Sequence, residues 1–186
     1  MDDSPEQGTL FADPSPAHDE LLGYRGPTAC SAAGITYRQL DYWARTALVV
    51  PTIRTATGSG SQRLYSFKDI LVLKVVKRLL DAGVSLQNIR VAVEALRSRG
   101  VADLAQVTLL SDGTTVYECT SSEEVVDLLQ GGQGVFGIAV SGALREVRGS
   151  LAQMPGERAE VVGTDESAGT PQDELSRRRQ QRSATA

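Results

Sequence analysis

The feature that most constrains this sequence is the stretch GITYRQLDYWARTALV at residues 34–49, which combines a helical pattern with basic and aromatic side chains. Three of the nine aromatic residues of the chain lie here. Thr36 is a favourable N-cap, and the apolar residues Leu40 and Trp43 recur at helical spacing on one face. The opposite face carries Arg38, Asp41, Tyr42 and Arg45. The stretch therefore predicts an amphipathic helix that buries one face and exposes a basic, aromatic face.

A shorter helix is expected immediately before it. Pro27 suits the first position of a helix over residues 27–33, and Gly34 is a residue that stops helices. Pro51 is expected to end the second helix. Two helices joined by a tight turn, with the basic face on the second, are typical of a helix-turn-helix that binds in the major groove of DNA. An ordinary solvated helix surface is the alternative for this face taken alone.

The next segment favours DNA binding over that alternative. Residues 52–66 form two short extended pieces joined by a Gly/Ser tip at residues 58–61, a pattern that predicts a β-hairpin. Arg54 and Arg63 flank the tip, so two cations lie near the base of a thin projection. Such a hairpin is typical of the wing of a winged helix-turn-helix, which contacts the DNA backbone or minor groove beside the helix.

Two further helices are expected at residues 66–83 and 85–100. Ser66 and Asp69 have the spacing of a capping box at the start of the first, and Gly83 suits its end. The second is expected to bury Ile89, Val93 and Leu96.

Residues 101–154 change character and predict a small α+β domain. Two strands, within residues 106–112 and 114–120, are expected to pair across the turn dipeptide Asp112-Gly113. A helix over residues 121–130, a buried strand or turn over 134–141 and an amphipathic helix over 142–154 follow.

Both ends of the chain are poor in apolar residues, so residues 1–22 and 155–186 are interpreted as disordered arms. Between them we expect a DNA-binding domain at residues 24–100 and the α+β domain at 101–154. The predicted fold class is therefore mainly α with a β wing, followed by a small α+β domain that dimerises or binds an effector. The arginine run near the C-terminus is interpreted as solvated charge rather than as a DNA contact.

The net charge of −4 conceals a strong asymmetry along the chain. Residues 27–100 carry eleven Lys and Arg against four Asp and Glu, a net charge of +7, whereas residues 1–26 and 101–150 each carry −5. A basic segment between acidic ones indicates a polyanionic partner for that segment alone.

The side chains needed for catalysis or metal binding are scarce. His18 is the only histidine, and Cys30 and Cys119 have neither the spacing of a zinc site nor a neighbouring histidine. Cys119 is interpreted as a structural thiol rather than a sensor, and the glycine-rich stretch GGQGVFG as a loop rather than a phosphate site. We predict no enzyme activity, no catalytic residue, no metal and no cofactor. Without a signal peptide or an apolar span, the protein is expected to be cytoplasmic, with no membrane partner.

The order of these elements resembles the MerR family of bacterial transcription regulators. The shared motifs are T-x-R-x-x-x-Y-(Y/W)-x-R from Thr36 to Arg45, followed by Pro51, and R-x-Y-x-x-x-D-(I/L) from Arg63 to Ile70. The motif G-(V/F)-S-L-x-x-I completes the set from Gly83 to Ile89. The whole chain is most similar to a mycobacterial and actinobacterial subgroup of this family.

The resemblance implies a homodimer that binds a palindromic element in double-stranded promoter DNA, distorts the promoter spacer and acts with the RNA polymerase holoenzyme. The DNA-binding residues that it implies are Thr36, Arg38, Gln39, Tyr42 and Arg45 on the recognition helix, Arg54, Arg63 and Tyr65 on the wing, and Lys68 at the next helix start.

The sequence departs from the family pattern at two points. Asp41 stands where many members carry a basic or neutral residue, and it is expected either to accept from a cytosine amino group or to pair with Arg38 or Arg45. No long dimerisation helix follows Gly100, so dimerisation is expected within residues 101–154, through the strand at residues 136–140 and the helix at residues 142–154. The sequence leaves open whether that domain also binds a small-molecule effector. A protein whose main role is interaction or ligand sensing is the alternative function.

Overall fold

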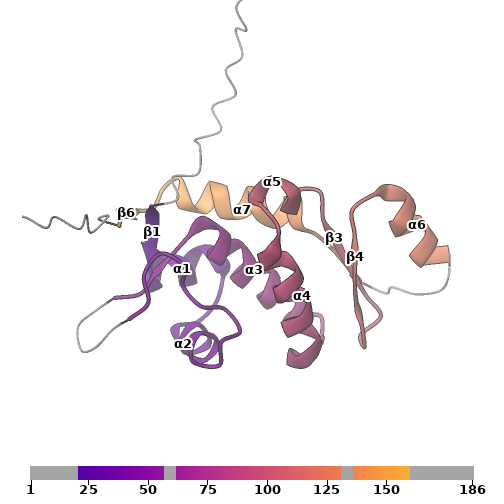
Figure 1. The fold of residues 1–186 in the computed structure, drawn as a ribbon, viewed down its shortest axis with the longest axis horizontal. Coiled ribbons are helices and arrows are strands. Elements are labelled where there is room, and N and C mark those ends of the chain that lie inside the picture. The colour runs from indigo at the N-terminus through magenta and orange to yellow at the C-terminus, as the bar shows by residue number, and fades with distance from the viewer. Residues whose placement is uncertain (1–20, 57–61, 131–135, 160–186) are drawn as a thin grey trace, which may run out of the picture.

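The structure is a computed structural model that describes residues 21–56, 62–130 and 136–159 (Figure 1). Its elements are β1 (Leu22–Arg25), α1 (Gly26–Ala33), α2 (Tyr37–Arg45), β2 (Leu64–Tyr65), α3 (Phe67–Asp81), α4 (Leu86–Ser98), α5 (Val101–Leu104), β3 (Thr108–Ser111), β4 (Val116–Cys119), α6 (Ser122–Gln130), β5 (Phe136–Ala139), α7 (Val140–Leu151) and β6 (Glu157–Arg158). The predicted fold class, a winged helix-turn-helix followed by a small α+β part, is confirmed, whereas dimerisation or effector binding by that part stays a prediction. Of the arms expected to be disordered, residues 21–22 and 155–159 are described, and there β6 pairs with β1; the remainder lies outside the described residues. Within the described residues, no helix combines the length and apolar character needed to cross a membrane.

The turn between α1 and α2 forms as the sequence predicts. Gly34 ends α1 in the left-handed region, with a φ of 74°, which a residue with a side chain adopts at a cost. The Thr36 hydroxyl accepts a hydrogen bond from the backbone N–H of Gln39, and the Gln39 side chain accepts one from the backbone N–H of Thr36. This capping box fixes the start of α2 at the expected residue.

The prediction that Pro51 ends this helix is wrong, because α2 ends at Arg45. The Thr46 hydroxyl donates to the Tyr42 carbonyl in the last turn. Ala47 then takes a left-handed φ of 55° and redirects the chain before the proline is reached. Pro51 therefore lies in the connection to the wing.

Helix α3 lies at the centre of the fold. The predicted capping box of Ser66 and Asp69 is present at its start. Eight of its fifteen residues are buried, and α1, α4 and α7 all pack against it. Because α3 is apolar on nearly every side, it needs neighbours on several faces.

Two small antiparallel sheets accompany the helices, and the first contains strands that the sequence did not predict. In that sheet, β1 lies between β2 and β6, with Tyr24 opposite Tyr65 and Leu22 opposite Arg158. The wing base is closed by a bridge between Arg54 and Leu64, while the expected Gly/Ser tip lies outside the described residues.

The second sheet has the order β4-β3-β5. The predicted pairing of β3 and β4 across Asp112-Gly113 is confirmed, and Asp112 Oδ1 accepts from the backbone N–H groups of Thr114 and Thr115 at 2.8 and 2.6 Å. The strand expected at residues 134–141 forms as β5, but it is an edge strand in which only Ile138 is buried. Most of the predicted glycine-rich loop lies outside the described residues.

Helix α7 returns from this sheet to the helix-turn-helix, and Figure 1 shows it running along the side of the molecule opposite α2. Its apolar face packs against α1 and α3 within one continuous hydrophobic core. Glu146 on α7 also pairs with Lys74 and Arg78 of α3, at 3.2 and 2.5 Å. The apolar face of α7 is therefore used within the chain, and it is not available for the dimer contact expected of the helix at residues 142–154. The core residues that α7 supplies are Val140, Ala143, Leu144, Val147 and Leu151.

We expect Leu144→Ala to destabilise the helix-turn-helix as well as the C-terminal part, because Leu144 is 7% exposed in the shared core. The free energy of unfolding should fall by about 2–4 kcal/mol. Trp43, the only tryptophan, lies in α2, so its fluorescence during urea unfolding reports on the helix-turn-helix. Val91→Ala, at a position that is 67% exposed, is the matched control. An unchanged Trp43 transition in Leu144→Ala would show that residues 24–100 unfold independently.

Candidate nucleic-acid interface

Helix α2 presents one face to the core and the other to solvent. Leu40 and Trp43 are each 2% exposed, whereas Tyr37 and Tyr42 are 63% and 49% exposed. Arg38 lies on the same outer face as Tyr42. The exposed face therefore carries the side chains that the helical periodicity predicts.

The two arginines of this face have different surroundings. Arg38 makes no hydrogen bond or ion pair with any part of the chain that the structure describes. Arg45 pairs with Asp41 at 2.5 Å, one helical turn before it. Only Arg38 therefore presents all of its donors to a ligand without first breaking a contact within the described residues.

Thr36 and Gln39 have local partners. The Gln39 side-chain oxygen accepts from the Thr36 backbone N–H at 2.9 Å and from its hydroxyl at 3.1 Å. These residues hold the N-terminus of α2, and they lie exposed or half-exposed beside its outer face. Their predicted contact with DNA stays a prediction.

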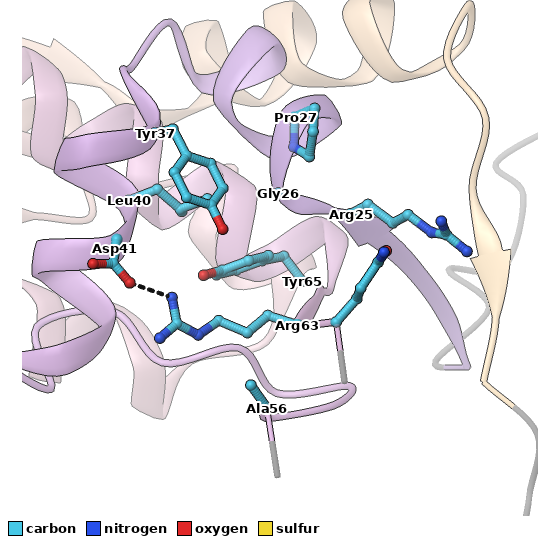
Figure 2. A pocket seen from close by; sticks show the side chains of 10 residues that line it. Arg25, Gly26, Pro27, Tyr37, Leu40, Asp41, Ala56, Arg63 and Tyr65 are labelled. Carbon is cyan, nitrogen blue, oxygen red and sulfur yellow. Dashed lines mark hydrogen bonds and ion pairs between the residues drawn. The ribbon is translucent and has the colours of Figure 1, made fainter. Parts of the chain in front are cut away.

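An open hollow of about 530 Å³ separates α2 from the base of the wing. Figure 2 shows Tyr65 between Tyr37 and Arg63 in this hollow, with Arg63 reaching across to Asp41. Arg63 Nη1 donates to Asp41 Oδ1 at 2.9 Å. The lining residues are Arg25, Gly26, Pro27, Tyr37, Leu40, Asp41, Ala56, Gln62, Arg63 and Tyr65.

The Tyr65 hydroxyl is buried beside the Arg63 guanidinium, yet it forms no hydrogen bond of normal geometry with the described residues. Burial raises the pKa of Tyr65 to about 12, because the phenolate would lose its hydration, and the nearby Arg63 only partly opposes this shift. The hydroxyl therefore keeps its proton at neutral pH, but the Tyr65 side chain is 0% exposed, so this donor does not reach the surface of the described residues.

Asp41 joins the recognition helix to the wing through its pairs with Arg45 and Arg63. The hydrogen bond from Arg63 is the main reason that the pKa of Asp41 is lowered, with the charges of both arginines adding to it. Of the contacts expected for Asp41 within the chain, the structure contains the pair with Arg45 and lacks one with Arg38. The contact with Arg63 was not predicted.

The other wing arginine contacts an acid from the far end of the chain. Arg54 donates to the Gln62 carbonyl at 3.1 Å and pairs with Glu157 at 3.2 Å. Glu157 also accepts from Arg25 at 2.7 Å, and this bond is the main cause of its lowered pKa. Sequence reasoning missed Arg25 and Glu157, because only the pairing of β1 with β6 brings them to the wing.

Lys68 was expected to contact phosphate, but its ammonium already has acceptors. It donates to the carbonyl of Arg97 at 2.7 Å and to that of Arg99. These carbonyls belong to the end of α4, where a cation is favourable. In this structure Lys68 therefore ties the start of α3 to the end of α4.

The approach to the wing is fixed by the buried Asp69, which is 4% exposed. Its Oδ2 accepts from the Thr52 backbone N–H and hydroxyl, both at 2.8 Å, and from the Ser66 backbone N–H at 2.9 Å. A charged acceptor with three donors holds the chain between α2 and the wing against α3.

Comparison with known proteins gives matches along most of the chain. The family model of the MerR HTH family regulatory protein matches residues 24–96. The chain is 72% identical over 178 residues to HTH-type transcriptional regulators of Mycobacterium tuberculosis and Mycobacterium bovis, covering 96% of this chain and 77% of each relative. It is also 30% identical over 83 residues to the HTH-type transcriptional regulator HmrR of Sinorhizobium medicae, covering 44% of this chain and 54% of that protein.

We expect Asp69→Ala to lower the free energy of unfolding by about 2–3 kcal/mol, because it leaves the donors of Thr52 and Ser66 without their charged acceptor. Urea unfolding followed by Trp43 fluorescence measures the change. Asp81→Ala, at an exposed position of α3, should change stability by less than about 0.5 kcal/mol. Equal losses in the two variants would mean that Asp69 does not stabilise the connection to the wing.

Proposed function

Because this chain belongs to the MerR family of helix-turn-helix regulatory proteins, we propose that it binds a palindromic promoter element as a homodimer and distorts the promoter spacer for RNA polymerase. Transcription regulation is the function of the family and of the mycobacterial relatives. The palindrome, the dimer, the distortion and the polymerase contact are the parts proposed for this chain. We also propose that it acts in the bacterial cytoplasm.

The observation that carries this proposal is the outer face of α2, with Arg38 unpaired among the described residues and Tyr42 and Arg45 beside it. A guanidinium can donate two parallel hydrogen bonds to a guanine edge, and a tyrosine hydroxyl can donate to phosphate. We assign base contact to Arg38, and groove or phosphate contact to Tyr42 and Arg45.

The wing residues are proposed to contact the sugar-phosphate backbone of the DNA. Arg63 lines the hollow and favours an anionic group there, whereas the fully buried Tyr65 behind it could donate to phosphate only after a local rearrangement. Arg54 lies at the wing base, and the Thr36–Gln39 cap lies at the N-terminus of α2, where the helix dipole favours phosphate. Among the residues implied to contact DNA, Lys68 is the least free to reach a phosphate, because its ammonium already donates to two backbone carbonyls.

Binding to DNA at different salt concentrations tests the proposal directly. A protein that neutralises several phosphates loses affinity steeply as salt rises. Mapping the sites bound in the genome would then give the operator and the regulated promoters. Weak binding to every duplex, without salt dependence, would instead favour docking to another macromolecule through the winged segment.

We expect Arg38→Ala to weaken binding to the preferred duplex by roughly 5-fold to 150-fold, because one bidentate base contact contributes about 1–3 kcal/mol. Preference at one base position should relax at the same time. Fluorescence anisotropy against single-base variants of the duplex measures both effects. Arg148→Ala removes the same charge from an exposed position of α7, the helix that Figure 1 shows on the side opposite α2, and is the control. Equal affinities in the two variants would exclude Arg38 from the interface.

The homodimer contact is proposed at α6 and the edge strand β5, because the apolar face of α7 is used inside the chain. Val126, Leu129 and Phe136 are 47%, 53% and 36% exposed there. Two copies of an antiparallel edge strand can pair about a two-fold axis, which suits a palindromic site. Residues 101–154 are thus still the proposed dimerisation domain. The proposal does not require a small-molecule effector in this domain, and it allows one.

We expect Leu129→Asp to convert the full-length protein from a dimer to a monomer, since it places a charge in the proposed contact. Sedimentation velocity measures the change. Val91→Asp on α4, at a position that is 67% exposed, is the control and should stay dimeric. Dissociation by Val91→Asp alone would move the dimer contact to α4.

A further inference from the structure

Four arginines around the proposed DNA-binding surface are held in pairs by two carboxylates. Asp41 bridges Arg45 on α2 and Arg63 at the wing base, at 2.5 and 2.9 Å. Glu157 on β6 bridges the other two, Arg25 at 2.7 Å and Arg54 at 3.2 Å. Asp41 therefore links α2 to the wing base, and Glu157 links β1 to the wing base. These are elements whose relative geometry has to stay fixed when the protein binds DNA.

The arginines are paired, yet most of them are still accessible. The side chains of Arg45, Arg25 and Arg54 are 70%, 55% and 44% exposed, and that of Arg63 is 26% exposed. The exposed ion pairs of Arg45, Arg25 and Arg54 contribute little to stability, whereas the half-buried pair of Arg63 with Asp41 can contribute more. Folding alone therefore gives no strong reason for three of these four contacts.

Glu157 reaches this surface from outside the segment that the family model matches, residues 24–96. Antiparallel pairing of β6 with β1 brings its carboxylate beside Arg25, and Arg54 comes from the wing base. The C-terminal part of the chain thus contributes a charge directly to the winged surface.

We propose that Asp41 and Glu157 determine specificity, acting as built-in counter-ions that suppress binding to arbitrary DNA while orienting the arginines for the operator. The inference rests on the proposed DNA-binding function. Affinity for arbitrary DNA comes from phosphate neutralisation and the release of counter-ions, so each internal carboxylate removes about one charge from that interaction. At the operator, contacts with the bases and with correctly placed phosphates offset this loss of electrostatic affinity.

The carboxylates also restrict the arginine geometry. A carboxylate that accepts from two guanidinium groups limits the rotamers of both, so less entropy is lost when the arginines meet phosphates in the correct register. Arg38, which has no partner among the described residues, lies outside these pairs and keeps its donors for bases. The paired arginines, which position the protein on the DNA backbone, are thereby distinct from Arg38, which reads bases.

The test uses full-length Asp41→Asn, Glu157→Gln and the double variant. Binding is measured by fluorescence anisotropy over a series of salt concentrations. The two probes are a random-sequence duplex and the tightest duplex selected from a random pool by the wild-type protein. The control is Asp103→Asn, which makes the same charge change at an exposed position of α5, a helix that Figure 1 shows far from α2.

Each single variant is expected to bind the random duplex about fivefold to tenfold more tightly near 0.1 M salt, with a salt slope steeper by about one. Affinity for the selected duplex should rise less, so the ratio of selected to random affinity falls. The double variant should show about twice the change in slope. Trp43 fluorescence during thermal unfolding verifies that each variant is folded.

The inference would be overturned if Asp41→Asn and Glu157→Gln bound the random duplex with the same affinity and salt slope as Asp103→Asn. A loss of binding to the selected duplex alone in Asp41→Asn would also overturn it, because that result would indicate that Asp41 reads a base. A wild-type protein that binds neither duplex in a salt-dependent way would instead overturn the proposed function. The two failures are therefore distinguishable in one set of titrations.

Discussion

The burial of α3 is the constraint on which the rest of the structure depends. Seven of its apolar side chains are buried, and they point in nearly every direction around the helix axis. Helices α1 and α4 of the helix-turn-helix segment cover part of this surface, and α7 covers another part. A DNA-binding unit that ended at residue 100 would leave that part exposed to water, at a cost of about 25 cal/mol for each Å² of apolar surface. The C-terminal half therefore completes the core.

Local signals predicted most of the elements, because helix caps and tight turns depend on residues that are close in sequence. Thr36 and Ser66 cap the helices that they were expected to cap, and Asp112-Gly113 forms the expected turn. The pairing of β1 with β6 joins segments more than a hundred residues apart and has no local signal. The apolar run of α3 was a usable signal for the docking of α7, since an apolar surface all round a helix requires partners on several sides.

The candidate site was predicted in part for the same reason. Helical periodicity is enough to place Arg38 and Tyr42 on the outer face of α2 and Trp43 in the core, as the structure has them. Periodicity says nothing about where a long flexible side chain ends. The ammonium of Lys68 turns to the end of α4, and Arg63 crosses to Asp41, because carbonyls and a carboxylate lie within reach in the folded chain.

The charge asymmetry of the sequence has a structural role beyond attracting DNA. Three acids of the C-terminal half pair with the basic segment: Glu118 with Arg99, Glu146 with Lys74 and Arg78, and Glu157 with Arg54. Three carboxylates thus compensate part of the surplus of seven positive charges of residues 27–100 inside the protein. Without this compensation the whole basic segment would attract phosphates, and affinity would be spread over surfaces that carry no sequence information. Within the part of the chain that the structure describes, Arg38 on the outer face of α2 is left as an arginine of the proposed DNA-binding surface without an acidic partner.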